Sequence, residues 1–237
     1  MRTLLVSICL LGALTAPLVA RNGEPPLELA VILNFKGPHS PVSIQEMERE
    51  AVLILNPAGV RLRWGMLGAG PAAPVYNHLA VMTFRGSCEF EQTPAEPGEL
   101  GPYAITRMAD GGMLPFGEVD CGRVVRAARR AMTSLDYGWA DKLVGRAMGR
   151  VVAHELIHIL TGSPRHGTEG ITQPSLSGEE LVQPVLQLSL LDIFKLRRDL
   201  KDPEGHFCRG CGETDLRTSA GVGDQNGQPI DRAHQTN

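Results

Sequence analysis

The pentapeptide His154-Glu155-Leu156-Ile157-His158 contains two histidines four residues apart, with a glutamate directly after the first. On an α-helix, residues four apart lie one above the other on the same face, so both imidazoles can reach one metal ion. Glu155 projects beside them and is not needed as a ligand, so its carboxylate is free to act as a general base toward a metal-bound water. The pattern therefore predicts two zinc ligands, His154 and His158, and one catalytic residue, Glu155.

The segment around this motif has the pattern of a buried helix. From Ala140 to Val152, apolar residues recur at steps of three and four, as on the core-facing side of a helix. Two histidines and a glutamate in a buried helix need polar partners, and a metal ion supplies them. In the alternative interpretation without a metal, the histidines are hydrogen-bonded core residues and the glutamate lies on the surface.

A catalytic zinc usually has three protein ligands and one open position, so a third ligand must come from elsewhere. After the helix, Gly162 can take the left-handed conformation that ends a helix, and Pro164 prevents the helix from continuing. The chain then turns sharply and brings His166 back toward the other two histidines. We therefore predict His166 as the third ligand of a single Zn²⁺. Three carboxylates compete with it for this role: Glu169, Glu179 and Glu180.

The arrangement His154-Glu155-x-x-His158-x-x-x-Gly162-x-x-x-His166 resembles the metzincin signature of zinc peptidases. In that signature a glycine lets the chain turn, so that a third histidine follows the HExxH helix closely. This chain has one extra residue before the glycine and one extra residue after it. The spacing is similar to that of uncharacterised secreted bacterial proteins of the HExxH class.

Metzincins also carry a methionine turn beneath the metal, and here the sequence departs from their pattern. Gly170-Ile171-Thr172 stands where a Gly-Ile-Met is expected, and the last methionine of the chain is Met148. The resemblance covers residues 151–172. It implies zinc-dependent hydrolysis of a peptide or protein substrate on a zincin-type fold, and it does not select a metzincin subfamily.

The first twenty residues predict export from the cytoplasm. Arg2 is followed by an uncharged, mostly apolar stretch from Thr3 to Ala20 and then by a polar segment with two prolines. This order is typical of a signal peptide cleaved near Ala20. An uncleaved membrane anchor is the alternative, because the apolar run is barely long enough to span a bilayer. We expect a secreted or periplasmic mature protein that has no contact with the membrane after cleavage.

The number of cysteines agrees with export, because four remain after the signal peptide and an even number can pair in an oxidising compartment. We expect a disulfide between Cys88, which ends a strand-like segment, and Cys121, which begins a helix after an intervening hairpin. Cys208 and Cys211 have three interpretations: a short local disulfide, a redox dithiol, or part of a second zinc site.

The overall composition limits the function without choosing it. The net charge of −3 gives no argument for nucleic-acid binding. A local basic cluster recurs at helical spacing and is interpreted as a solvated helix face: Arg123, Arg126, Arg129 and Arg130. We expect residues 1–20 to be the signal peptide, residues 21–212 one catalytic domain, and the polar, glycine-rich residues 213–237 a disordered tail.

The remaining segments predict an α+β fold, with a mixed β-sheet packed on helices that include the HExxH helix. Expected strands cover residues 29–35, 60–64, 79–84, 103–108 and 113–116, and expected helices cover 43–56, 119–134, 139–161 and 177–200. The first helix is assigned a capping box at Ser43 and Glu46. The last helix tolerates Pro184 because this proline falls in its first turns. Its buried face is expected to consist of Leu186, Leu190, Ile193, Phe194 and Arg197. By resemblance to zincins, residues 103–108 or 113–116 form the sheet edge that pairs with an extended substrate.

These inferences together predict a secreted zinc metallopeptidase with zinc on three histidines and Glu155 as general base. Two other classes of protein remain open. One is a secreted binding domain without activity that keeps zinc for stability. The other is a thiol or disulfide protein centred on Cys208 and Cys211.

Overall fold

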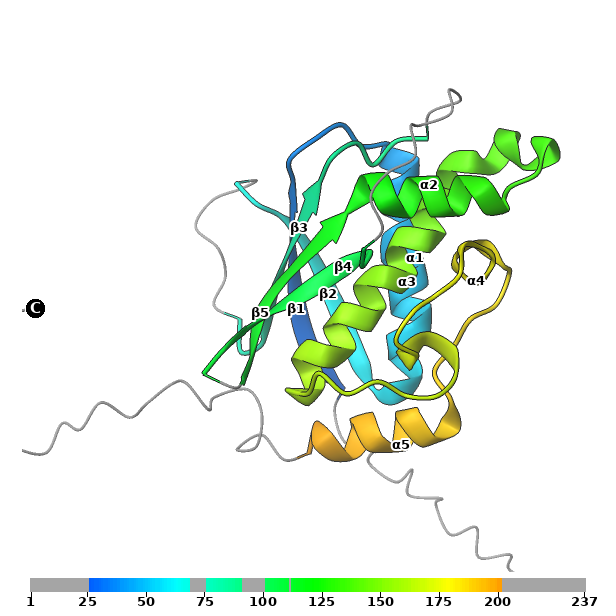
Figure 1. Cartoon of the computed structure of the whole chain (residues 1–237). Coiled ribbons are helices and arrows are strands. Elements are labelled where there is room, and N and C mark those ends of the chain that lie inside the picture. The colour runs from blue at the N-terminus through cyan, green and yellow to red at the C-terminus, as the bar shows by residue number, and fades with distance from the viewer. Residues whose placement is uncertain (1–25, 69–75, 91–100, 111, 202–237) are drawn as a thin grey trace, which may run out of the picture.

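The computed structural model describes residues 26–68, 76–90, 101–110 and 112–201. A five-stranded mixed sheet packs against helices on one side (Figure 1), which confirms the α+β class. The expected signal peptide, the Cys208 and Cys211 pair and the tail from residue 213 lie outside the described residues. In the part of the chain that is described, no helix has both the length and the apolar character needed to span a membrane.

The strands lie in the order β2-β1-β3-β5-β4, with bounds Val60–Met66, Leu27–Phe35, Leu79–Arg85, Gly112–Asp120 and Ala104–Ala109. The first four are parallel to one another, and β4 pairs antiparallel with β5 at one edge. Of the two strands considered for the edge, β4 therefore occupies it, whereas β5 lies between β3 and β4. Three successive residues of the central strand β1 are buried, Leu29, Ala30 and Val31, and β1 has a parallel neighbour on each side.

Helix α1 (Pro41–Leu55) begins earlier than the capping box at Ser43 predicts. Ser40 is its N-cap and Pro41 occupies the first turn, where the missing N–H of proline costs nothing. Ser43 instead lies in the first turn of α1 and is buried, and its hydroxyl donates a 2.8 Å hydrogen bond to the carbonyl of Asp141. The predicted cap was wrong because this serine faces a neighbouring helix, which the local pattern does not reveal.

Helix α3 (Ala140–Thr161) carries the HExxH motif and packs closely along α1, next to the sheet (Figure 1). Its bounds agree with the predicted helix. Gly145 and Gly149 face α1, and a Cβ atom added at Gly149 would lie 2.7 Å from the carbonyl oxygen of Met47. The two glycines let the helix backbones approach closely, so the motif is held against a rigid support.

Helix α2 (Cys121–Ala131) begins at the disulfide between Cys88 and Cys121, which confirms the predicted pairing. The helix starts two residues later than predicted, because Val119 and Asp120 still pair with β3 as the end of β5. The Asp120 side chain caps the helix by accepting from the backbone N–H of Arg123 at 3.0 Å. The disulfide thus links the segment after β3 to the junction of β5 and α2.

The single helix predicted at residues 177–200 is two helices, α4 (Gly178–Val182) and α5 (Leu190–Asp199). A residue before proline is disfavoured in the helical region, and Gln183 before Pro184 is extended with ψ 157°. Of the predicted buried face, Leu186 and Ile193 do pack against the core, but the break resets the helical phase and the rest of that face is exposed. Leu190 and Phe194 are 77% and 69% exposed, whereas Leu196 is 2% exposed.

Candidate metal centre

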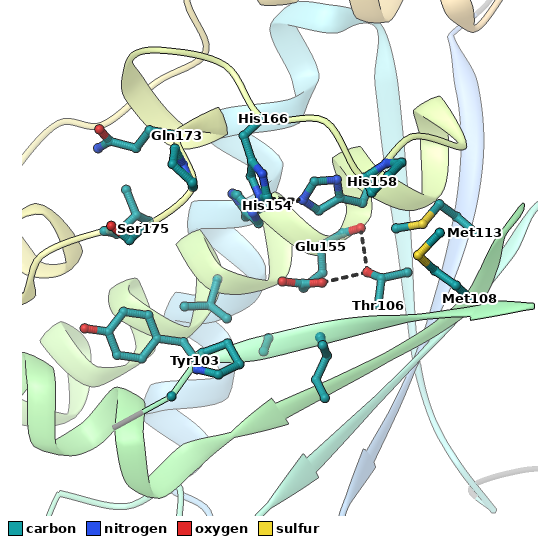
Figure 2. Close-up of a pocket in the computed structure, with 18 residues that line it drawn as sticks. Tyr103, Thr106, Met108, Met113, His154, Glu155, His158, His166, Gln173 and Ser175 are labelled. Carbon is teal, nitrogen blue, oxygen red and sulfur yellow. Dashed lines mark hydrogen bonds between the residues drawn. The ribbon is translucent and has the colours of Figure 1, made fainter. Parts of the chain in front are cut away.

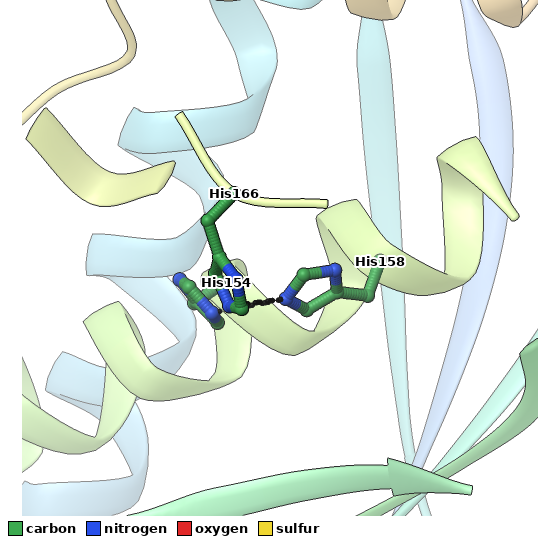
Figure 3. A group of neighbouring side chains, drawn as sticks. All are labelled: His154, His158 and His166. Atoms are coloured by element: carbon green, nitrogen blue, oxygen red, sulfur yellow. Dashed lines mark hydrogen bonds between the residues drawn. The ribbon is translucent and has the colours of Figure 1, made fainter. Parts of the chain in front are cut away.

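The end of α3 places the motif residues where the helical spacing predicts. His154 and His158 lie one turn apart, and Glu155 projects beside them toward β4 (Figure 2). The helix stops at Gly162, whose φ of 58° lies in the left-handed region, as predicted. The turn directs the next residues back along the helix, so that His166 reaches the same point in space as the first two histidines (Figure 3).

Three imidazoles converge on one point. The Nε2 atom of His158 lies 3.0 Å from Nε2 of His154 and 3.2 Å from Nε2 of His166. The candidate ligand atoms of all three lie within 4.8 Å of one another. The competing carboxylates Glu169, Glu179 and Glu180 are not part of this group. Glu180 is engaged elsewhere, because its carboxylate caps α4 at Ser177 and accepts from Gln173.

Hydrogen bonds on the far side of two rings define which nitrogen carries the hydrogen. Nδ1 of His154 lies 2.8 Å from the carbonyl of Ile171, and Nδ1 of His158 lies 2.7 Å from the carbonyl of Ser163. A carbonyl oxygen only accepts, so each Nδ1 is the donor. In the neutral rings both Nε2 atoms then present lone pairs to each other, 3.0 Å apart. Two facing lone pairs repel each other, and a cation bound to both nitrogens relieves this repulsion.

The donor set and its spacing fit zinc. Three imidazole nitrogens at about 2.0–2.1 Å from a tetrahedral zinc are roughly 3.3 Å apart, close to the distances seen here. Three protein ligands leave a fourth position open, as in catalytic rather than structural zinc sites. The carbonyls of Ile171 and Ser163 orient His154 and His158, as outer hydrogen-bond partners do in metal sites.

The surroundings shift the proton affinities of the site. Burial lowers the pKa of His154 to about 4, because the charged ring loses its hydration. Burial also lowers the pKa of His166. For Glu155, burial raises the pKa of the carboxyl, and a hydrogen bond from Thr106 opposes this rise. The lowered pKa values of His154 and His166 favour their neutral rings, the form in which an imidazole binds a metal.

The short segment Gly170–Thr172 lies against His154 and against the residue that follows His166. Gly170–Thr172 forms a short 3₁₀ turn, and its Ile171 is fully buried and supplies the carbonyl to His154. The N–H of Gly167, next to His166, donates to the carbonyl of Thr172 at 2.8 Å. The Thr172 hydroxyl in turn donates to Asp192 at the start of α5, also at 2.8 Å. Sequence reasoning missed Thr172 and Asp192, because nothing local links them.

A cavity of about 430 Å³ opens beside the histidines. Its floor is α3, with Glu155 and the first two histidines, and its walls are β4 and the segment that follows His166 (Figure 2). Most of the other lining side chains are apolar or uncharged, among them Tyr103, Ile105, Met108, Met113 and Leu176. An extended chain laid along β4 would pass beside the converging nitrogens.

The sequence matches no protein-family model and no curated protein. Among solved structures, the chain is similar to archaemetzincin from Methanopyrus kandleri, with 13% identity and a TM-score of 0.45. The match covers 78% of this chain and 99% of the other. This likeness is too distant to bear on function, so the site is interpreted from its own residues.

Proposed function

We propose that this protein is a secreted zinc metallopeptidase that hydrolyses peptide bonds. The observation that carries the proposal is the convergence of three histidine Nε2 atoms beside Glu155 in the wall of one cavity. His154, His158 and His166 would hold the zinc ion, and Glu155 is the catalytic residue. The N-terminal apolar stretch and the Cys88–Cys121 disulfide support action outside the cytoplasm.

The chemistry divides between the metal and the chain. Zinc, when bound, polarises the scissile carbonyl and makes a water molecule more acidic. Glu155 accepts a proton from the attacking water and delivers it to the leaving amine. Its buried position raises the pKa of its carboxyl, so the carboxylate takes up a proton more readily than an exposed glutamate does.

A peptide or protein substrate fits the edge of the sheet. Among the described residues, β4 has a strand neighbour, β5, on one side only, so the backbone groups on its other side can pair with an extended chain. The uncharged lining of the cavity favours apolar side chains next to the cleaved bond. Substrate binding thus uses main-chain hydrogen bonds for affinity and the cavity for selectivity.

The first test is the metal content of the secreted, mature protein, purified without added metal and without chelators. We expect about one zinc per chain in the wild type, no zinc in His154→Ala, and zinc without peptide hydrolysis in Glu155→Ala. A Glu155→Ala variant with normal hydrolysis would contradict the mechanism.

The same preparation separates the two other classes of protein. Stoichiometric zinc without cleavage of any peptide in a broad library would favour a binding domain that keeps the metal for stability. Free thiols at Cys208 and Cys211 in the mature protein, with no zinc bound, would favour a thiol protein.

A further inference from the structure

The carboxylate of Glu155 makes a short hydrogen bond to the edge strand. The hydroxyl of Thr106, on β4, donates to Oε2 of Glu155 at 2.6 Å and lies 3.4 Å from the carbonyl of Glu155 (Figure 2). The two residues are 49 positions apart in the chain. The bond therefore joins the motif helix to the strand at the edge of the sheet.

This bond restrains one oxygen of the carboxylate and leaves the other available. Oε1 has no hydrogen-bond partner among the described residues, and Glu155 lines the cavity beside the histidines. A free glutamate side chain samples several rotamers, and a hydrogen bond that a hydroxyl donates to its charged carboxylate selects one of them. A general base must lie within hydrogen-bond reach of the proton it takes, so this restraint bears on catalysis.

Thr106 is well placed for such a restraint. It lies where the pairing of β4 and β5 shifts register, between Thr106 and Met108. Its backbone belongs to β4, which lies at the edge of the sheet formed by the described residues, and its side chain faces α3. The same strand, β4, would thus hold both the Glu155 carboxylate and a substrate bound along its edge, which keeps the distance between them constant.

We propose that Thr106 is the positioning residue for Glu155, holding the carboxylate in the orientation in which its second oxygen takes the proton of the attacking water. This inference rests on the proposed peptidase function. Thr106 does not touch the reacting atoms, and it acts only through Glu155.

The test compares Thr106→Val with Thr106→Ser in zinc-loaded protein. Valine keeps the shape and β-branching of threonine but removes the hydroxyl, whereas serine keeps the hydroxyl. With a general base contributing roughly 10²–10⁴-fold, we expect kcat for a peptide substrate to fall about tenfold in Thr106→Val, with KM and zinc content unchanged. In Thr106→Ser we expect kcat to be largely restored.

A matched control is Thr83→Val on β3. The Thr83 hydroxyl accepts a hydrogen bond from Asn34 rather than contacting Glu155, so we expect unchanged kinetics. A loss of kcat in Thr106→Ser equal to that in Thr106→Val would overturn the proposal, because the hydroxyl would then be irrelevant. A rise in KM at unchanged kcat, or a loss of zinc, would also overturn it, because Thr106 would then act on the substrate or on the fold.

A second measurement does not depend on activity. In zinc-free protein labelled with ¹³C at glutamate carboxyls, the Glu155 signal, assigned with Glu155→Gln, should shift in Thr106→Val and stay in place in Thr83→Val. If the signal does not move in Thr106→Val, Thr106 does not hydrogen-bond to Glu155 and the proposal is overturned. If the wild type cleaves no peptide, the peptidase function fails separately, and this signal still decides whether Thr106 holds Glu155.

Discussion

Arg150 and Glu50 form a buried ion pair one helical turn before His154. The guanidinium of Arg150 is fully buried, and its Nε and Nη2 atoms both lie 2.9 Å from Oε1 of Glu50 on α1. The same guanidinium donates to the carbonyls of Glu180 and Gln183, at 2.6 and 2.8 Å. One side chain of α3 thus joins α1 to the end of α4, next to the segment that forms the wall of the cavity.

Arg150→Met should destabilise the protein strongly. The substitution removes the closest partner of the buried Glu50 carboxylate, which keeps only a 3.4 Å contact with Arg49. It also removes the donor to the Glu180 carbonyl and the shorter of two donors to the Gln183 carbonyl. Breaking a buried ion pair costs about 3–5 kcal/mol. Urea unfolding of the zinc-free protein measures the free energy of unfolding of each variant. Arg63→Ala is the control, because its ion pair with Glu28 is exposed and should matter little. A similar stability of both variants would refute the role of the buried pair.

Thr172→Val should weaken zinc binding. The substitution removes the hydrogen bond to Asp192 that fixes the turn carrying the Ile171 carbonyl, and so loosens the partner of His154. Loss of such outer partners typically lowers metal affinity about 10–100-fold. Competition with a chromophoric chelator measures the affinity. Thr133→Val removes a similar bond to Asp136 at the other end of α3 and should leave the affinity unchanged.

The stability of the zinc-free protein should depend on His154 between pH 6.5 and about 4. The pKa of His154 falls from 6.5 in the unfolded chain to about 4 in the folded chain, because the ring is buried. Within this window the unfolded state binds the additional proton, so stability falls as the pH falls. Burial raises the pKa of Glu155, which has the opposite effect on stability.

The contribution of His154 is therefore measured as a difference between two proteins. Unfolding free energies of wild type and His154→Gln, both zinc-free, are compared from pH 7 down to pH 4. We expect the wild type to lose stability relative to the variant as the pH falls. Parallel pH profiles would show that His154 has an ordinary pKa.

Gly149→Ala should destabilise the packing of α1 on α3. Alanine is favoured over glycine within a helix by about 1 kcal/mol, but here its Cβ would lie 2.7 Å from both the Met47 carbonyl and the Cβ of Glu50. Overpacking of this kind costs about 1–3 kcal/mol, so we expect a net loss of stability in thermal unfolding. Gly138→Ala has open space around the added carbon and is the control. Equal melting temperatures for the two variants would show that the helices can separate freely.

Local features of the site could be predicted from the sequence because they follow from helix geometry and chain stereochemistry. The four-residue spacing places His154 and His158 on one face, and glycine at position 162 permits the left-handed turn that ends the helix. The convergence of His166 follows from that turn and the short loop after it. The predicted cap failed because Ser43 forms a hydrogen bond with Asp141, which is distant in the sequence. The predicted last helix failed because Pro184 interrupts it and resets the helical phase.

The sequence by itself determined the three histidines, the adjacent glutamate, the α+β class and the pairing of Cys88 with Cys121. Only the tertiary structure decided which groups hold those residues in place. Thr106 comes from β4, the Ile171 carbonyl from a turn fastened to α5, and the support beneath α3 from Glu50 on α1. The physical reason is that spacing along a helix is a local property, whereas a hydrogen bond between residues 49 or 100 positions apart exists only after the chain has packed.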